Sequence, residues 1–232
     1  MSFDWQTCKL IGITKPNSEA ILQYYEPGKT KELEAKDLIG YCARVSNPKN
    51  QENFTTSDKL LKYCMVNEHW SVFETVSITI EICTTRDIGR QILRHRSFSF
   101  QEFSQRYAEK GEAFPSDDYR ECRLQDNRNR QNSLDTADEA IKLNWLAAQV
   151  KVEQIALEQY NWAIKAGIAK EVARCILPEG LTMSRMYMAG TLRSWIHYCL
   201  LRMDNGTQKE HQDIAKKCWN IITDEFDFLH NV

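Results

Sequence analysis

Apolar and polar residues alternate through Thr75-Val76-Ser77-Ile78-Thr79-Ile80-Glu81-Ile82-Cys83. Successive side chains of a β-strand point to opposite faces, so this period of two predicts a strand. Thr85 follows directly and can cap a helix through Ile92 and Leu93, which we expect to end near Arg96. The sequence therefore predicts a strand that is followed at once by a helix.

Further elements are predicted on both sides of this strand. They are a strand over 7–14, helices over 37–45 and from Ser57 to about His69, a long helix from about Asp138 to Ala166 that Gly167 stops, a short helix over 169–176, a strand over 181–188, a helix capped by Thr191 and a last helix opened by a capping-box pattern over 207–210. Residues 97–107 are expected to be loop, and residues 108–136 a long polar excursion. Strands in the first half and helices in the second predict one α+β or α/β domain over residues 1–232.

Composition narrows the class of protein. The chain has 232 residues, of which 42% are hydrophobic and 27% charged, as in an ordinary globular protein. Its net charge of −2 argues against a nucleic-acid binder, because such proteins usually carry a basic face. No apolar run approaches the ~18 residues of a membrane helix, and the first residues lack the pattern of a signal peptide. We therefore expect a cytoplasmic protein that binds neither nucleic acid nor membrane.

Cysteine, histidine and tryptophan positions carry three further expectations. Eight cysteines include no C-x-x-C pair, so we expect no disulfide framework, and apolar neighbours favour unreactive core thiols at Cys42, Cys64 and Cys175. The five histidines form no H-x-x-H or H-E-x-x-H pair, so we expect no metal site. Helical spacing favours core positions for four tryptophans: Trp145, Trp162, Trp195 and Trp219.

An arginine-rich stretch runs Arg94-His95-Arg96-Ser97-Phe98-Ser99-Phe100-Gln101-Glu102-Phe103-Ser104-Gln105-Arg106-Tyr107. It contains no Lys and no Asp, unlike an ordinary solvated surface, and aromatic residues are interleaved with its three arginines. Arginine presents a planar fork that matches phosphate and carboxylate oxygens. The alternative is a charged loop held by surface ion pairs, but only Glu102 and Glu109 are near in sequence. The stretch therefore indicates a site for an anionic ligand with a ring, such as a nucleotide.

A second set of basic residues follows towards the C-terminus. Arg174 has apolar neighbours, and a partly buried arginine needs an anionic partner, either a carboxylate such as Glu171 or Glu179 or a substrate. Arg193 and Arg202 are spaced to lie close to one helix face, and Arg185 completes the set. Local turn contacts and ligand binding explain equally well the polar residues at one helix–strand junction: His69, Ser71 and Glu74.

Arg94-His95-Arg96, followed after seven residues by Ser104, has the form R-H-R-x7-S, which resembles the signature of the flavin-dependent thymidylate synthases. The resemblance extends over nearly the whole chain, from Ala43-Arg44-Val45-Ser46 to the last helix. Further segments carry it in the same order: Gln105-Arg106-Tyr107, Arg130-Gln131-Asn132-Ser133, Glu171-Val172-Ala173-Arg174-Cys175-Ile176-Leu177-Pro178, Gly190-Thr191-Leu192-Arg193-Ser194-Trp195, Leu201-Arg202 and Gln208-Lys209-Glu210. The three-residue core is weak by itself, whereas the ordered set is highly specific.

This resemblance implies a fold, a reaction and an assembly. Members of the family have a central, largely antiparallel sheet flanked by helices, and they methylate dUMP to dTMP. They use FAD, with methylenetetrahydrofolate as carbon donor and NADPH as reductant, so a reduced flavin would deliver a hydride. Thymidylate synthases without flavin attack the uracil with a cysteine in a Pro-Cys-His setting, and no Pro-Cys pair occurs here. The family forms homotetramers with ligands between subunits, so arginines that are distant in sequence would share one site.

Site roles follow from the resemblance, position by position. FAD would contact His69, Ser71, Glu74, Arg94, His95, Arg96, Glu102, Thr191, Leu192, Arg193 and His197. dUMP would contact Gln91, Ile92, Leu93, Arg94, Glu102, Phe103, Ser104, Gln105, Arg106, Arg174 and Arg202. Arg202 would be the catalytic residue, a fixed cation that stabilises negative charge as the uracil ionises. Ser104 and Arg106 suit the phosphate, and a nucleophilic role for Ser104 is disfavoured because the sequence shows no His–Asp relay to activate it.

Two segments depart from the family pattern. Thr75 stands where many members have His, and Asp204-Asn205-Gly206-Thr207 stands where some carry a histidine. Two other interpretations are a nucleotide- or nucleic-acid-binding module without chemistry, and a nucleotide enzyme that shares the fold but not the flavin. Flavin bound to the purified protein separates both from a synthase.

Overall fold

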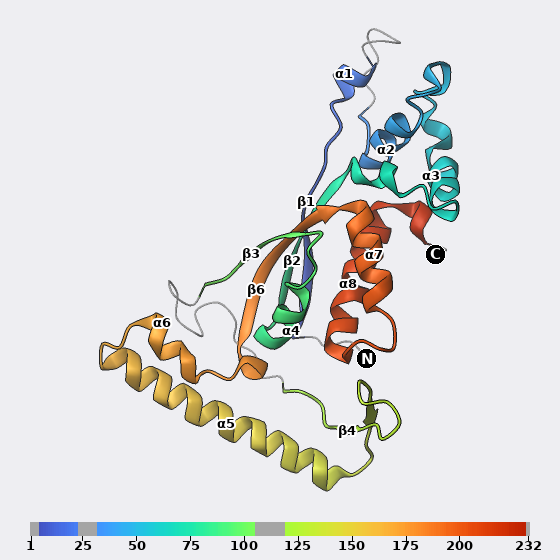
Figure 1. The fold of residues 1–232 in the computed structure, drawn as a ribbon. Coiled ribbons are helices and arrows are strands. Elements are labelled where there is room, and N and C mark those ends of the chain that lie inside the picture. Colours follow the sequence, from blue (N-terminus) through green and yellow to red (C-terminus); the bar gives the residue numbers. More distant parts are fainter. Residues whose placement is uncertain (1–4, 23–31, 105–118, 231–232) are drawn as a thin grey trace.

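A four-stranded antiparallel sheet forms the centre of the computed structural model, which describes residues 5–22, 32–104 and 119–230 (Figure 1). The strand order is β1-β2-β6-β3, with β1 at Thr7–Ile13, β2 at Ser77–Thr85, β6 at Met183–Thr191 and β3 at Ser99–Glu102. The longest ladder joins β2 to β6, from the pair Ser77↔Thr191 to the pair Thr85↔Met183. The antiparallel sheet that the family resemblance implied is confirmed.

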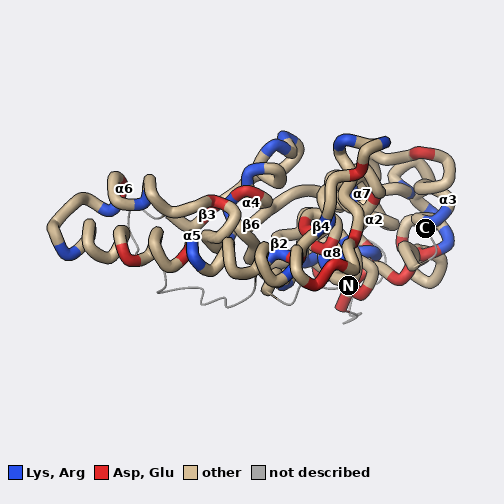
Figure 2. Tube along the Cα trace, turned by 90° about the horizontal axis from the view of Figure 1, so that it is seen from below, with Lys and Arg blue, Asp and Glu red and all other residues tan. Residues whose placement is uncertain are grey.

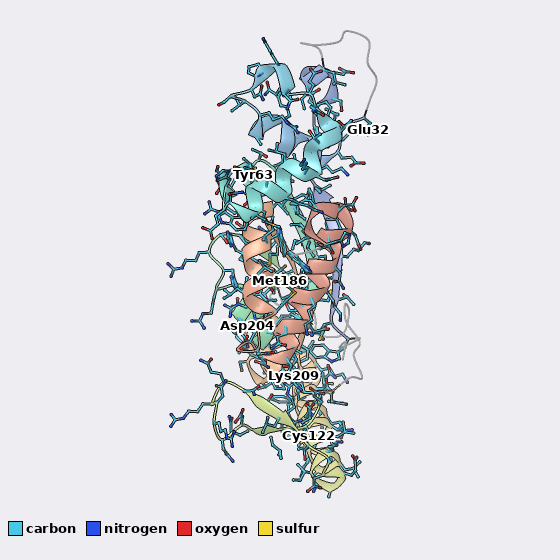
Figure 3. The ribbon with its side chains drawn as sticks, turned by 90° about the vertical axis from the view of Figure 1, so that its right-hand side faces the viewer. Glu32, Tyr63, Cys122, Met186, Asp204 and Lys209 are labelled. Atoms are coloured by element: carbon cyan, nitrogen blue, oxygen red, sulfur yellow. The ribbon has the colours of Figure 1, made fainter. Side chains whose placement is uncertain are left out.

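Helices cover the apolar face of this sheet. Its strands direct Ile78, Ile80 and Ile82 of β2 and Met186 and Met188 of β6 into the core, and all five are fully buried. Their neighbours along the strands are half-buried or exposed, as period two requires. Figure 3 shows Met186 behind the two helices that lie side by side on this face, α7 at Leu192–Arg202 and α8 at Lys209–Glu225.

The helices have identifiable start and stop signals. Thr191 caps α7 by accepting a hydrogen bond from the backbone N–H of Ser194 at 3.3 Å. Asp138 caps α5 (Glu139–Lys165) in the same way, and Gly167 follows that helix with a φ of 82°, which glycine adopts without strain. The other α-helices are α1 at Ser18–Leu22, α2 at Ala35–Ala43, α3 at Ser57–Val66, α4 at Arg86–Ile92 and α6 at Lys170–Ala173.

Short elements complete the described chain. The 3-10 turns are η1 at Pro48–Asn50, η2 at Phe54–Thr56, η3 at Trp70–Glu74, η4 at Arg174–Ile176, η5 at Glu179–Leu181 and η6 at Asp227–Leu229. A separate hairpin pairs β4 (Arg123–Gln125) with β5 (Ser133–Asp135). Figure 1 shows α5 running from this hairpin beneath the sheet, with α6 beyond its far end. No helix within the described residues is both long and apolar enough to cross a membrane.

Most expected elements are confirmed, and the errors have physical causes. Residues 97–107 are expected to be loop. Instead, Ser99–Glu102 forms the edge strand β3, because the backbone of β6 is available for antiparallel pairing on that side. The helix expected to end near Arg96 already ends at Ile92. The capping box expected over 207–210 is wrong, since Gln208 is the N-cap of α8 and makes no side-chain cap bond. Residues 105–107, and the excursion as far as residue 118, lie outside the described chain.

Burial corrects three further expectations. Trp195 is fully buried and Trp219 packs partly buried against the core, but Trp145 and Trp162 on α5 are 44% and 60% exposed. The indole N–H of Trp145 donates to the backbone oxygen of Arg120 at 3.1 Å, but the described residues leave much of both side chains exposed. Cys64 is buried and Cys42 half-buried, whereas Cys175 is exposed; all eight cysteines are free thiols.

Replacing Gly190 tests the packing of the sheet against the stretch that follows α4. A Cβ at Gly190 would lie 2.4 Å from the Phe98 ring, so we expect Gly190→Ala to lower the free energy of unfolding by about 1–3 kcal/mol. The control is Gly12→Ala in β1, where a Cβ has no atom within 4 Å. Urea unfolding at one protein concentration measures both variants, and equal stability of the two would contradict this packing.

Candidate active site

A hydrogen bond joins the end of α7 to the arginine-rich stretch. The Nε–H of Arg202 donates to Nε2 of His95 at 2.9 Å, although the two residues are 107 positions apart. His95 lies in the turn after α4, and Arg202 is the last residue of α7. Because Nε2 accepts, the ring proton of neutral His95 is on Nδ1. The fold therefore brings the predicted catalytic arginine to the motif that the sequence singled out.

Burial keeps the histidines around Arg202 neutral. It lowers the pKa of His95 to about 4, and the charge of Arg202 acts in the same direction. It lowers the pKa of His211 to about 3, with smaller effects from Arg202 and His95. The two rings lie edge to face, with centroids 6.3 Å apart. At neutral pH the guanidinium of Arg202 is thus a cation beside two uncharged rings.

The predicted flavin residues on η3 and α7 lie together. Arg193 of α7 forms an ion pair with Glu74 of η3. His197 packs on Trp70 of η3 with ring centroids 4.4 Å apart. Among the others, Ser71 is exposed, Thr191 is the N-cap described above, Leu192 is fully buried and His69 is exposed beside the Tyr63 ring. The structure thus joins two predicted segments that are more than a hundred residues apart in sequence.

Two arginines of the motif are open to a ligand. Arg94 and Arg96 are exposed, and neither side chain has a hydrogen bond or ion pair to another residue of the described chain. Glu102, by contrast, is held in place, because the buried Ser184 donates from Oγ to its Oε1 at 2.9 Å. Two guanidinium groups without a partner in the described chain, and an oriented carboxylate in the same motif, are what an anionic nucleotide with donor hydroxyls requires.

The predicted dUMP residues are only partly brought together. Gln91 contacts His211, Ile92 is fully buried in the core, Leu93 is half-buried, and Phe103 and Ser104 follow β3. Gln105 and Arg106 lie outside the described residues. Arg174 directly follows α6, which Figure 1 shows apart from α7, and its Nε–H donates to the backbone oxygen of Glu171 at 3.3 Å. Within one chain, Arg174 therefore lies apart from Arg202.

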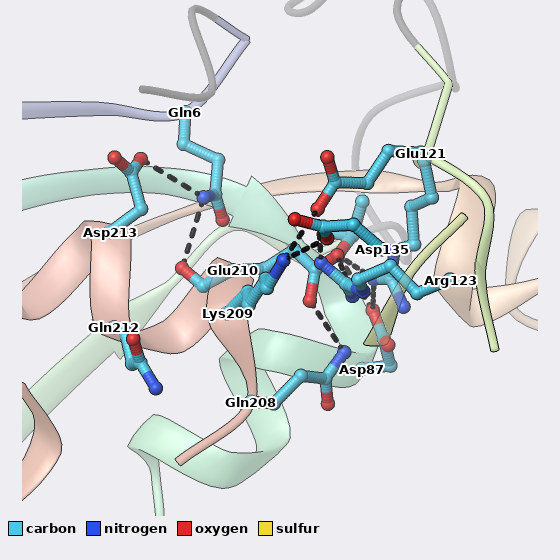
Figure 4. A network of polar contacts seen from close by, with 12 residues as sticks. Gln6, Asp87, Glu121, Arg123, Asp135, Gln208, Lys209, Glu210, Gln212 and Asp213 are labelled. Carbon is cyan, nitrogen blue, oxygen red and sulfur yellow. Dashed lines mark hydrogen bonds and ion pairs between the residues drawn. The ribbon is translucent and has the colours of Figure 1, made fainter. Parts of the chain in front are cut away.

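A polar network and a cleft adjoin this cluster. Gln91 donates from Nε2 to Oε1 of Gln208 at 2.8 Å, and Gln208 leads to the buried Glu210, which is paired with Arg123 (Figure 4). A cleft of about 960 Å³ opens here between the hairpin, α5 and the start of α8, and Gln208 lines it together with the motif Arg130–Ser133. Figure 3 places Lys209 beside the segment that carries Cys122.

Sequence reasoning missed His211, Tyr198 and Ser184. One signal for His211 was present, because it stands three, seven and eleven positions before Ile214, Cys218 and Ile222 on the buried stripe of α8. A histidine on such a stripe must find hydrogen-bond partners inside the protein. No group of three or more His, Cys, Asp or Glu side chains among the described residues could hold a metal ion.

Acidic and basic residues alternate along the elements rather than gathering on one side in the view from below the sheet (Figure 2). Many are paired with each other, as in Arg90 with Glu179, Arg120 with Asp87 and Lys217 with Asp213. A nucleic-acid-binding module usually presents a continuous basic face. The unpaired arginines next to His95 therefore indicate a local anion site rather than a surface for a polyanion.

Known proteins similar to this chain include flavin-dependent thymidylate synthases and a UMP/dUMP methylase. The model of the thymidylate synthase complementing protein family matches residues 30–226. A probable flavin-dependent thymidylate synthase of Paramecium bursaria Chlorella virus 1 is 49% identical over 220 residues, which cover 95% of each chain. The flavin-dependent thymidylate synthase of Synechocystis sp. is also 49% identical over 220 residues, 94% of each chain. Among solved structures, the UMP/dUMP methylase PolB of Streptomyces cacaoi, bound with 5-Br dUMP, has a TM-score of 0.76 at 23% identity, covering 96% of this chain and 92% of PolB.

The titration of His95 tests the geometry of this cluster. Its folded pKa of about 4 lies below the ordinary value of 6.5, so its contribution to stability is complete above pH 6.5 and is lost as the pH falls towards 4. Removing the charge in Arg202→Met should raise the pKa of His95, though not fully to 6.5, because burial is the larger cause. Histidine NMR titration measures the pKa, with Arg96→Met as the control that should leave it unchanged. An unaltered pKa in Arg202→Met would contradict the contact.

Proposed function

The chain belongs to the family of the thymidylate synthase complementing proteins, the flavin-dependent thymidylate synthases, and on that premise we propose that it methylates dUMP to dTMP with FAD, methylenetetrahydrofolate as carbon donor and NADPH as reductant. The hydrogen bond from Arg202 to His95 carries the proposal. It brings one cation to a motif whose Arg94 and Arg96 are unpaired within the described residues. A nucleotide phosphate and a flavin diphosphate are the anions that such forks suit.

The residues present fit a flavin. FAD needs cations for its diphosphate and an apolar or aromatic wall for its ring system. Arg94 and Arg96 have no partner among the described residues and can provide the cations, and Trp70 with His197 forms an aromatic surface between η3 and α7. Bound FAD would supply the hydride; the protein would hold it through His69, Ser71, Glu74, Arg94, His95, Arg96, Glu102, Thr191, Leu192, Arg193 and His197.

The hydrogen bond to His95 also orients Arg202 for catalysis. A guanidinium has five N–H donors, and His95 takes the one on Nε. The Nη1 and Nη2 groups have no hydrogen bond to another residue of the described chain. We assign them to the uracil edge, where a fixed cation stabilises the negative charge that develops as N3 loses its proton. Because burial lowers the pKa of His95 and keeps it neutral, Arg202 is the charged member of this pair.

A nucleotide phosphate would be held by the remaining residues of the dUMP set. Ser104, with a hydroxyl and a backbone N–H, is assigned to the phosphate together with Arg106. Glu102 would contact a ribose hydroxyl through the carboxylate that Ser184 orients. Gln91, Ile92, Leu93, Phe103, Gln105 and Arg174 complete the proposed dUMP set.

We assign the completed site to a homotetramer. Arg174 follows α6, which Figure 1 shows apart from the helix α7 that ends at Arg202, so a second copy would supply it to the same nucleotide. The long helix α5 has an exposed apolar stripe with spacings of four, three, four and three residues, from Ile141 through Trp145 and Ala148 to Val152 and Ile155. This is the heptad spacing with which helices pack against one another. Ile141, Trp145 and Ala148 line the cleft beside the hairpin of the same chain, so the rest of the stripe, at Val152 and Ile155, is the surface that we assign to another subunit.

Domain organisation and location are also part of the proposal. The main core cluster draws residues from Ala35 to Leu229, with Cys8 packed against it, which supports one domain over residues 1–232. Eight free thiols suit a reducing compartment, which supports a cytoplasmic location.

Arg202→Ala tests the catalytic assignment. Wild-type protein should be yellow, with flavin absorbance near ~450 nm, and should release tritium from dUMP labelled at C5 in an anaerobic assay with all three co-reactants. The variant should keep its FAD but lose ~10²–10³-fold in rate, because one transition-state cation is removed. Wild-type protein that cannot be reconstituted with FAD would overturn the proposed function. Near-normal turnover in the variant would overturn only the role of Arg202.

Ile155→Glu tests the assembly. A buried charge in the heptad stripe of α5 should dissociate the tetramer and abolish turnover, because the sites then lose the partner's arginine. Asn161→Glu adds the same charge at an exposed position outside the stripe and should stay tetrameric. Analytical ultracentrifugation and the tritium assay measure the two variants. A fully active, monomeric Ile155→Glu protein is the result that the subunit-shared site forbids.

A further inference from the structure

The side-chain amide of Gln91 is held on both of its sides. Its Oε1 lies 3.2 Å from Nδ1 of His211, and its Nε2 donates to Oε1 of Gln208 at 2.8 Å. His211 is in the first turn of α8 and is fully buried, while Gln208 is the N-cap of the same helix. Two residues at the start of α8 therefore hold the side chain of Gln91, which lies on α4 and belongs to the proposed dUMP set.

A buried ion pair fixes the direction of these hydrogen bonds. Glu210 is fully buried and is paired with Arg123, and as a carboxylate it can only accept. The amide nitrogen of Gln208 donates to Oε2 of Glu210 at 2.9 Å, so the amide oxygen of Gln208 must face Gln91 (Figure 4). Gln91 must then turn its nitrogen to Gln208 and its oxygen to His211. Hydrogen-bond chemistry thus settles the orientation of both amides.

The direction of hydrogen-bond donation set by Glu210 also determines which nitrogen of His211 carries the proton. Its Nδ1 must carry the proton and donate to Gln91, which leaves Nε2 as an acceptor. The hydroxyl of Tyr198, 3.1 Å from Nε2, therefore donates to it. A ring whose pKa burial lowers to about 3 stays neutral at physiological pH, so this arrangement does not change near neutrality. His95 packs edge-on against Tyr198, with centroids 4.8 Å apart, which ties the chain to the neighbour of Arg202.

We propose that His211 is a positioning residue for the substrate: by donating to the oxygen of Gln91, it presents the second N–H of that amide to an acceptor oxygen of the nucleotide. This inference rests on the proposed function, in which Gln91 contacts dUMP. The second N–H of Gln91 has no hydrogen-bond partner among the described residues. If the amide turned over, it would offer an oxygen to that nucleotide oxygen, and two acceptors would oppose each other.

Two variants of His211 that are isosteric with each other separate the effect of the N–H donor from the effect of lost packing. Leu and Asn have the same branched shape, both lose the ring and the Tyr198 contact, but Asn keeps an N–H near the position of Nδ1. We expect His211→Leu to weaken dUMP binding roughly 3- to 10-fold, which is the contribution of one hydrogen bond. His211→Asn should bind dUMP nearly as the wild type does. Calorimetric titration of the FAD-loaded protein with dUMP gives the affinities, and FAD affinity should be alike in both variants.

A double variant tests whether His211 acts through Gln91. In a Gln91→Leu background, His211→Leu should cause no further loss of dUMP affinity. Equal losses in the Leu and Asn variants, or additive losses in the double variant, would overturn the inference. Should the His211 variants fail to fold, Gln208→Leu releases the other side of the amide at a half-buried position. That variant should weaken dUMP binding to a similar extent, and unchanged affinity would overturn the inference as well.

The two levels of the proposal fail differently. Wild-type protein that binds no dUMP contradicts the proposed function and, with it, the role of His211. Wild-type protein that binds dUMP and releases tritium, combined with equal affinities of the Leu and Asn variants, contradicts the role of His211 alone.

Discussion

The antiparallel pairing of β2 with β6 determines where the candidate site forms. Each strand runs directly into a helix, β2 into α4 and β6 into α7, and the pairing places the starts of these helices at opposite ends of the ladder. The ladder is roughly 30 Å long. At 1.5 Å per residue, α7 returns roughly 16 Å and α4 roughly 10 Å, so their ends meet. Arg202 and His95 contact each other at that meeting point.

Charge within this cluster is concentrated on one group. Burial keeps His95 and His211 neutral, so they orient their neighbours through hydrogen bonds and do not repel the guanidinium. Arg202 carries the positive charge of this cluster. The ion pair of Glu210 and Arg123 anchors Gln208. This ion pair and the hydrogen bonds of the two histidines preorganise the site before any ligand enters.

The sequence was most informative where local physics determines the structure. The alternation over 75–83 predicts β2, and the hydroxyl of Thr191 predicts the start of α7, because each depends on neighbouring residues alone. Strand β3 was missed, because four residues form a strand there only when the edge of β6 is available. The order of the arginine motifs predicts a set of site residues, but periodicity could not reveal that His95 would accept a hydrogen bond from Arg202, a contact made across the fold.

The exposed residues of α5 and the position of Arg174 after α6 both support the proposed homotetramer. Trp145 and Trp162 have the spacing of core residues, and a core position is what a second subunit would provide. Sequence patterning does not distinguish a core within one chain from a core between chains. It predicted burial for Trp145 and Trp162, which are 44% and 60% exposed in the single chain.

A crystal structure of the protein with FAD and dUMP bound would test the proposed site and the proposed homotetramer most directly. Arg202 should keep its Nε hydrogen bond to His95 and direct its Nη groups to the uracil edge, while Arg174 of a second subunit reaches the same nucleotide. An Arg202 side chain turned away from His95 and the pyrimidine would contradict this arrangement.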